Sequence, residues 1–147
     1  MKPEEIVLQL KQTKEFEKVL AKLSFQEFED FVAWVCEKNG FRVRKNLRFK
    51  LGRKHEIDVV AEKENFVLCI DCKKWSGGRY KKSQLKKAAQ AHEAKCKALQ
   101  QFLKDERKFF SLIVTLMEED LLTQNSTVFI PAWKLNSFLL EAERYLL

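Results

Sequence analysis

Glycine and proline are scarce in this sequence, at 4 and 2 residues of 147. Flexible linkers and low-complexity tracts are rich in these residues, so their scarcity excludes a chain of small domains joined by flexible segments. The sequence also has no visible internal repeat. With 46% hydrophobic residues the chain can bury one good core. We therefore expect a single domain over residues 1–147, with residues 1–23 as a helical extension and 24–147 as the core.

Long apolar runs are missing as well. No segment approaches the length needed to cross a bilayer, and residues 1–5 lack the hydrophobic core of a signal peptide. Of the four cysteines, Cys69 and Cys72 would face opposite sides of one strand and could not chelate one ion together. The sequence thus predicts a cytoplasmic protein that does not bind membranes, with reduced cysteines in its core.

Positive charge is concentrated in the middle of the chain. The net charge is +7, and residues 42–97 hold 17 of the 28 basic residues but 6 of the 21 acidic ones. Such a region attracts polyanions, so we expect nucleic acid as the partner. Two aromatic side chains interleaved with these residues would either stack on nucleobases or cover the end of the sheet. The predicted contacts are Arg42, Arg44, Lys45, Arg48, Arg53, Lys54, Lys74, Trp75, Arg79, Tyr80, Lys81, Lys82 and Lys86.

Two apolar runs carry acids and a lysine, which are costly to bury. Residues 55–61 include Glu56 and Asp58, and residues 66–75 include Asp71 and Lys73. Both runs have the composition of strands, and a turn over residues 62–65 would pair them antiparallel. Alternate side chains of a strand share a face, so each pair would point one way. Both acid-bearing stretches would then reach a common sheet surface.

Acids at these positions predict a magnesium or manganese site. A divalent cation between Asp58 and Asp71 would remove their mutual repulsion. Lys73 could then orient or deprotonate an attacking water, or neutralise charge on a phosphate. The arrangement fits metal-assisted hydrolysis of a phosphodiester bond. The structural alternative is that one acid ends a strand and the other forms a buried ion pair with Lys73.

At these residues the sequence resembles the PD-(D/E)XK nuclease superfamily, whose signature is an acid on one strand and acid-x-lysine on the next. Asp58 matches the first acid and Asp71-Cys72-Lys73 the second element. The chain looks most like Mrr-like restriction endonucleases and related archaeal nucleases. Many of these carry glutamine at the position of Asp71, and no proline precedes Asp58. The matching segments are Phe28-Glu29, Gly40-Phe41 and Lys73-Lys74-Trp75, within residues 24–103.

The resemblance implies two further groups at the site. Glu29 would be an assisting catalytic and metal-binding acid, because it lies at the border of the apolar stripe of its helix. The alternative for Glu29 is a solvated flank. The backbone carbonyl of Cys72 would be a further metal ligand.

The periodicity predicts an α/β fold. We expect a restriction-endonuclease-like core, a mixed central β-sheet flanked by helices, with an extra N-terminal helix. Ser24 and Glu27 have the spacing of a capping box that begins a helix closed by Gly40. His92 would be a core histidine of a later helix. The expected helices are residues 4–23, as one helix or two short ones, and 25–39, 82–104 and 135–147. The expected strands are 41–50, 55–61, 66–75, 109–116 and 127–130.

These features together predict a DNA endonuclease that depends on Mg²⁺ or Mn²⁺ and acts in restriction or in DNA repair and recombination. It would work as a homodimer or within a larger nuclease complex, because 147 residues leave little room for a separate target-recognition domain. Two alternatives stay open. One is a structure-specific nuclease of the Holliday-junction resolvase type, and the other is a non-catalytic nucleic-acid-binding module.

Overall fold

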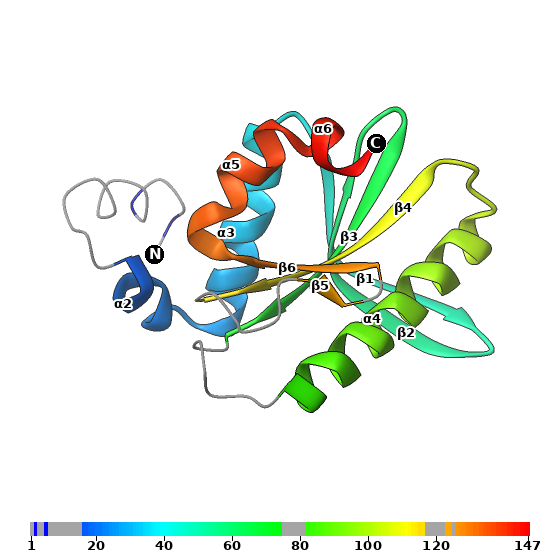
Figure 1. Cartoon of the computed structure of the whole chain (residues 1–147), viewed down its shortest axis with the longest axis horizontal. Coiled ribbons are helices and arrows are strands. Elements are labelled where there is room, and N and C mark those ends of the chain that lie inside the picture. The colour runs from blue at the N-terminus through cyan, green and yellow to red at the C-terminus, as the bar shows by residue number, and fades with distance from the viewer. Residues whose placement is uncertain (1, 3–4, 6–15, 75–81, 117–122, 125) are drawn as a thin grey trace.

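The computed structural model describes residues 2, 5, 16–74, 82–116, 123, 124 and 126–147. Its elements follow one another around a six-stranded mixed sheet (Figure 1). They are α2 (Phe16–Ala21), α3 (Phe25–Lys38), β1 (Arg42–Leu51), β2 (Arg53–Glu62), β3 (Phe66–Lys73), α4 (Lys82–Leu103), β4 (Lys108–Thr115), β5 (Thr123–Gln124), β6 (Thr127–Pro131), the 3-10 helix η1 (Ala132–Lys134), α5 (Leu135–Leu140) and α6 (Ala142–Leu146).

Helix α3 begins and ends where its sequence predicts. The Ser24 hydroxyl accepts a hydrogen bond from the Glu27 N–H at 3.1 Å, and the Glu27 carboxylate accepts one from the Ser24 N–H at 2.8 Å, which completes the capping box. At the other end Gly40 has a φ of +85°, a conformation that side-chain-bearing residues rarely adopt. The buried face includes Phe28 and Val32.

The sheet has the order β1-β2-β3-β4-β6-β5. The first three strands are antiparallel neighbours, β4 is parallel to β3, and β6 is parallel to β4. Helix α4 makes the crossover from β3 to β4, as parallel neighbours require. Strand β3 is central and buried on both faces, so that Ile70 packs on one side and Cys69 on the other.

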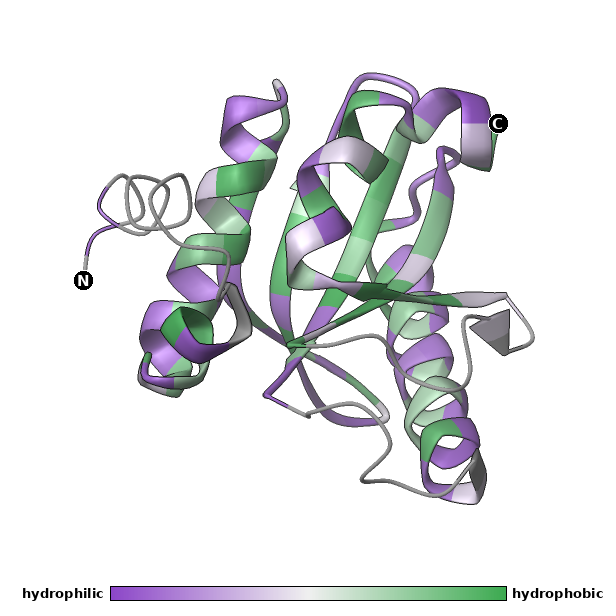
Figure 2. Ribbon diagram, turned by 60° about the vertical axis from the view of Figure 1, so that its left-hand side comes forward, coloured by the Kyte–Doolittle hydropathy of each residue, from purple (hydrophilic) through white to green (hydrophobic). Residues whose placement is uncertain are grey.

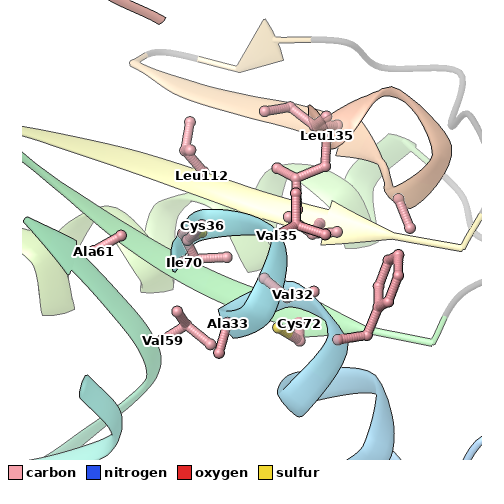
Figure 3. Close-up of a cluster of buried hydrophobic side chains, with 14 of the residues drawn as sticks. Val32, Ala33, Val35, Cys36, Val59, Ala61, Ile70, Cys72, Leu112 and Leu135 are labelled. Carbon is pink, nitrogen blue, oxygen red and sulfur yellow. The ribbon is translucent and has the colours of Figure 1, made fainter. Parts of the chain in front are cut away.

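Helices cover both faces of the sheet. Helices α3 and α5 lie on one face and α4 on the other (Figure 1). The main core cluster lies under α3, where Val32 and Ala33 lie near Cys72 of β3 and Val59 of β2 (Figure 3). A smaller cluster joins α4 to the opposite face. The hydropathy colouring follows these layers, with apolar central strands and helices that are apolar on one side (Figure 2).

Several expectations need correction. The final helix is interrupted, because α5 ends at Leu140 and Glu141 leaves helical geometry before α6 begins. The short strand β5 was not expected. Leu103, which continues the apolar face of α4 in the sequence, is 42% exposed at the helix end. Residues 6–15 of the expected first helix lie outside the described residues. The whole described part of the chain contains no helix that is long and apolar enough to span a membrane.

All four cysteines are free thiols and buried, as the sequence predicts. Cys69 packs towards α4 and Cys72 towards α3, on opposite faces of β3. Burial raises the pKa of the Cys36 thiol to about 12, and burial likewise raises the pKa of Cys72. These thiols are therefore inert packing groups.

Candidate active site

The two aspartates lie where strands β2 and β3 separate. The ladder between these strands ends at the pair Val59 and Ile70, and Asp58 and Asp71 are the next residues beyond it. The Cys72 N–H donates a hydrogen bond to Oδ2 of Asp58 at 2.9 Å. A side-chain oxygen thus replaces the backbone partner that Cys72 would have in a continuing ladder, and this contact holds the Asp58 carboxyl between the strands.

At this point the side chains of strands β1 and β2 exchange the faces of the sheet that they occupy, a change that we call the turnover. Leu47 and Ile57 are paired and pack with the cluster on the α4 side, whereas Val59 packs with the main core under α3. The side-chain alternation therefore shifts by one residue in both strands, between 45 and 47 and between 57 and 59. Asn46 lies at the shift in β1 and has a φ of +52°. The left-handed region is open to Asn at lower cost than to most residues.

The shift lies between Ile57 and Val59, so it does not separate Glu56 from Asp58. The Glu56 carboxylate pairs with Nε of Arg48 at 3.4 Å on the hairpin surface, where its side chain is 43% exposed. Asp58 instead hydrogen bonds with Asp71. Glu56 therefore lies at the exposed border of the cluster, where, after burial, its charge helps to raise the pKa of Glu29.

The two aspartates titrate in opposite directions. Burial, followed by the hydrogen bond with Asp71, raises the pKa of Asp58 to about 7. Burial also disfavours the charge of Asp71, but the hydrogen bond with Asp58 and the Lys73 ammonium outweigh it and lower the pKa of Asp71. Nζ of Lys73 lies 3.2 Å from Oδ2 of Asp71. One of the two carboxyl groups is therefore readily ionised, and the other is either protonated or needs a nearby cation to be ionised.

Glu29 reaches the same cluster from α3. It is 3% exposed, and it hydrogen bonds with Asp58. Burial raises the pKa of Glu29 more than that hydrogen bond lowers it. The structure thus places Glu29 beside the aspartates and not on a solvated flank. Its neighbour Asp30 faces outward and pairs with Lys45, with Nζ and Oδ1 2.6 Å apart.

Two neighbouring residues support the cluster. His92 of α4 is buried, and its Nε2 lies 2.8 Å from the Cys69 carbonyl oxygen. Burial lowers the pKa of His92, so its neutral ring donates the Nε2–H to that carbonyl. Lys74 donates a hydrogen bond to the Leu23 carbonyl. This contact ties the end of β3 to the residues before α3.

The basic residues of the sequence prediction fall into two groups. In the β1–β2 hairpin, Arg44 lies 3.8 Å from Glu62, while Arg42, Arg53 and Lys54 are exposed. On α4, Lys86 is exposed. The predicted contacts Trp75, Arg79, Tyr80 and Lys81 lie outside the described residues, and the side chain of Lys82 is likewise not described. Lys74 is half-buried, with its ammonium on Leu23.

The residues present fit a hard divalent cation. Among the residues that the structure describes, no three His, Cys, Asp or Glu side chains form a ready-made ligand group. Mg²⁺, however, is commonly held by one or two carboxylates, with waters and substrate phosphate completing its shell. Asp58 and Asp71 supply such oxygens, and because burial and the neighbouring Asp71 raise the pKa of Asp58, a bound cation would favour its charged form. The Cys72 carbonyl as a further ligand stays a prediction.

Helix α3 is followed by three antiparallel strands, the crossover helix α4 and the parallel strand β4, and the acids lie where β2 and β3 separate. This arrangement defines a PD-(D/E)XK-like nuclease fold. The chain belongs to the nuclease-related domain family, whose model matches residues 24–117. A relative from Archaeoglobus fulgidus, described as an uncharacterized protein, is 34% identical over 126 residues, which are 84% of this chain and 95% of that protein.

Two solved structures share the fold. The small subunit of the heterodimeric restriction endonuclease R.BspD6I has a TM-score of 0.55 at 16% identity, over 89% of this chain and 77% of that one. Protein VC1899 from Vibrio cholerae has a TM-score of 0.50 at 14% identity, over 82% of this chain and 33% of that one. This chain therefore spans a third of the VC1899 chain.

Sequence reasoning missed the role of Asn46. The signal was present, since an asparagine among strand-forming residues often marks a left-handed backbone position. Its importance depends on the residue opposite, which only the pairing of β1 with β2 reveals.

Proposed function

We propose that this protein is an endonuclease that hydrolyses phosphodiester bonds in DNA with Mg²⁺ or Mn²⁺. The observation that carries the proposal is the contact cluster of Asp58, Asp71 and Lys73 where β2 and β3 separate. Membership of the nuclease-related domain family and the restriction-endonuclease-like fold support it.

Each residue has a role in this chemistry. Asp58 and Asp71 would hold the cation, with Glu29 assisting from α3. The bound cation would supply Lewis-acid stabilisation of charge on the phosphate. Lys73 orients the attacking water and donates a hydrogen bond to a phosphate oxygen as negative charge develops there. The water oxygen bonds to phosphorus and gives up a proton to solvent, the opposite P–O bond breaks, and the departing oxygen takes up a proton from solvent, so one water is consumed for each bond cleaved.

The decisive experiment is a cleavage assay on linear duplex, single-stranded, flapped and four-way-junction DNA, with Mg²⁺, Mn²⁺ or EDTA. We expect metal-dependent cutting by the wild type and a loss of at least about 100-fold in Asp58→Asn and Asp71→Asn, with DNA binding retained. Glu106→Gln, at an exposed acid outside the cluster, is the charge-matched control. Cleavage that survives both aspartate changes, or that persists in EDTA, would contradict the proposal.

The same panel separates the biological settings. Preference for the four-way junction would identify a resolvase, and preference for linear duplex a restriction or repair enzyme. The structural neighbour R.BspD6I small subunit is part of a heterodimer, so the proposal includes assembly with a second copy or another subunit. Light scattering of the purified protein with and without DNA measures that assembly.

A further inference from the structure

The β1–β2 hairpin extends beyond the rest of the sheet. Its ladder continues to the pair Leu51 and Arg53, around a turn at Gly52, whereas the ladder between β2 and β3 stops at Val59. Residues 47–57 therefore form a two-stranded projection, which we call the arm. The arm begins next to Asp58, where the side chains change faces, so the arm adjoins the acid cluster directly along the chain.

One face of the arm is seated on α4 (Figure 1). Phe49 packs with Ile57 and Leu99 in the cluster on that side. The Phe49 ring also lies 5.3 Å from that of Phe102 and is stacked on His55 at 5.0 Å, measured between ring centroids. This packing fixes the arm in one orientation, so its other face is available for binding a partner.

The other face is basic. Arg48 lies opposite Glu56, and Lys50 lies opposite Lys54, with Arg53 at the turn. Like charges directly across a ladder destabilise a hairpin, and the exposed pair of lysines therefore lacks a stabilising role in the free protein. An anionic partner would turn the same pair into an attractive surface.

We infer that the arm lies in the major groove of B-form duplex DNA beside the scissile phosphate. This inference rests on the proposed function and names the substrate class. The major groove is about 12 Å wide and admits a two-stranded ribbon. The deep, narrow major groove of an A-form RNA duplex does not admit side chains in this way, and a single strand has no groove.

The size of the arm sets a footprint. Its strands run five residues beyond Asp58 on β2, a length of about 17 Å at ~3.4 Å per residue. That length is about half a turn of B-DNA, or about five base pairs. The arm would thus contact about five base pairs on one side of the cleaved bond.

Binding by the cleavage-deficient Asp71→Asn protein in EDTA tests the inference without any chemistry. Fluorescence anisotropy would compare a 20-base-pair DNA duplex, the matching RNA duplex and the single strand over a range of salt concentrations. The test variant adds Lys50→Gln, Arg53→Gln and Lys54→Gln. The matched control adds Lys38→Gln, Lys108→Gln and Arg144→Gln, three exposed basic residues near the opposite end of the sheet.

We expect the arm variant to bind the DNA duplex at least about tenfold more weakly and to lower the salt slope by about 2 to 3, because each phosphate contact contributes about 0.9. The control should keep the slope. Replacing guanines by 7-deazaguanine within five base pairs of the cut should also weaken binding, since this removes a major-groove acceptor. Unchanged binding by the arm variant, or equal arm-dependent binding of the RNA duplex, would overturn the inference.

The outcomes separate the two proposals. Arm-dependent binding of duplex DNA by a wild-type protein that cuts nothing would contradict the proposed function and leave only the placement of the arm in the major groove standing. Metal-dependent cleavage that is insensitive to the arm variant would support the function and contradict the inference.

Discussion

Asn46 of β1 lies opposite Asp58 of β2, between the pairs Lys45 with Val59 and Leu47 with Ile57. Both strands exchange their inward and outward faces at this pair, and Asn46 has a φ of +52°. The turnover leaves Asp58 outside the β2–β3 ladder and in contact with Cys72 and Asp71. The backbone of β1 therefore positions a carboxyl group on its neighbour.

A β-branched residue at position 46 should disturb the site. Asn46→Val places a Cβ-branched side chain in the left-handed region, which should cost about 1–2 kcal/mol of unfolding free energy. The displaced Asp58 should also weaken Mn²⁺ binding, measured by calorimetry. Asn46→Gly, which accepts this φ, should restore metal affinity.

Lys104 supplies the control for that change, because it has the same φ of +52° at the end of α4. Lys104→Val should lower stability by a similar amount in urea titrations and leave Mn²⁺ affinity unchanged. If both variants lower the affinity equally, general destabilisation explains the effect and Asn46 has no positioning role.

Asp58 should make the metal-free protein less stable at alkaline pH. The pKa of Asp58 is raised to about 7 from an ordinary value of 3.8. The protonated carboxyl thus contributes stability that is complete below about pH 4 and is lost as the pH rises through about 7. Asp58→Asn mimics the protonated form. In EDTA its unfolding free energy relative to wild type should increase by about 1–2 kcal/mol between pH 5 and 8, a figure reduced for the partial solvent exposure of the site.

Two measurements complete this test. Mg²⁺ at pH 8 should stabilise the wild type and leave Asp58→Asn unchanged. Asp105→Asn is the control of opposite sign, because the hydrogen bond from Arg107 lowers the pKa of Asp105. Its effect on stability should be constant between pH 5 and 8. A wild-type minus Asp58→Asn difference that does not change with pH would show that Asp58 is ionised throughout this range.

Lys73 should act on the rate of cleavage more than on binding. Its ammonium lies 3.2 Å from Asp71 and at the edge of the cluster. Lys73→Gln should lower the single-turnover rate by about 10²- to 10³-fold, and Lys73→Arg should recover part of that rate. Lys108→Gln, at the far end of β4, controls for lost charge. A variant that binds DNA more weakly but cuts bound DNA at the wild-type rate would make Lys73 a phosphate anchor only.

Local sequence patterns were sufficient to predict most of the elements. Three elements can each be predicted from a short stretch of sequence, namely the start of α3 from the capping box at Ser24, β3 from its apolar run, and α4 from its amphipathic pattern. Local hydrogen bonding and periodicity are sufficient for these predictions. The same patterns missed the interruption at Glu141, which leaves helical geometry although buried residues lie on both sides of it, at Leu139 and Ala142. They also predicted an uninterrupted alternation through Asp58, which the turnover at Asn46 breaks.

The sequence by itself thus determined the class of fold and which residue types are available for chemistry, namely the acids of two adjacent strands, a lysine two residues on, and basic flanks. Tertiary structure alone decided which of those residues meet. It brought Glu29 from α3 to Asp58, left Glu56 partly exposed in a pair with Arg48, and separated β2 from β3 so that a carboxyl group took the place of a backbone partner. The physical reason is that burial and the distance between charged groups set the pKa values and contacts of these acids, and both arise only when distant segments pack together.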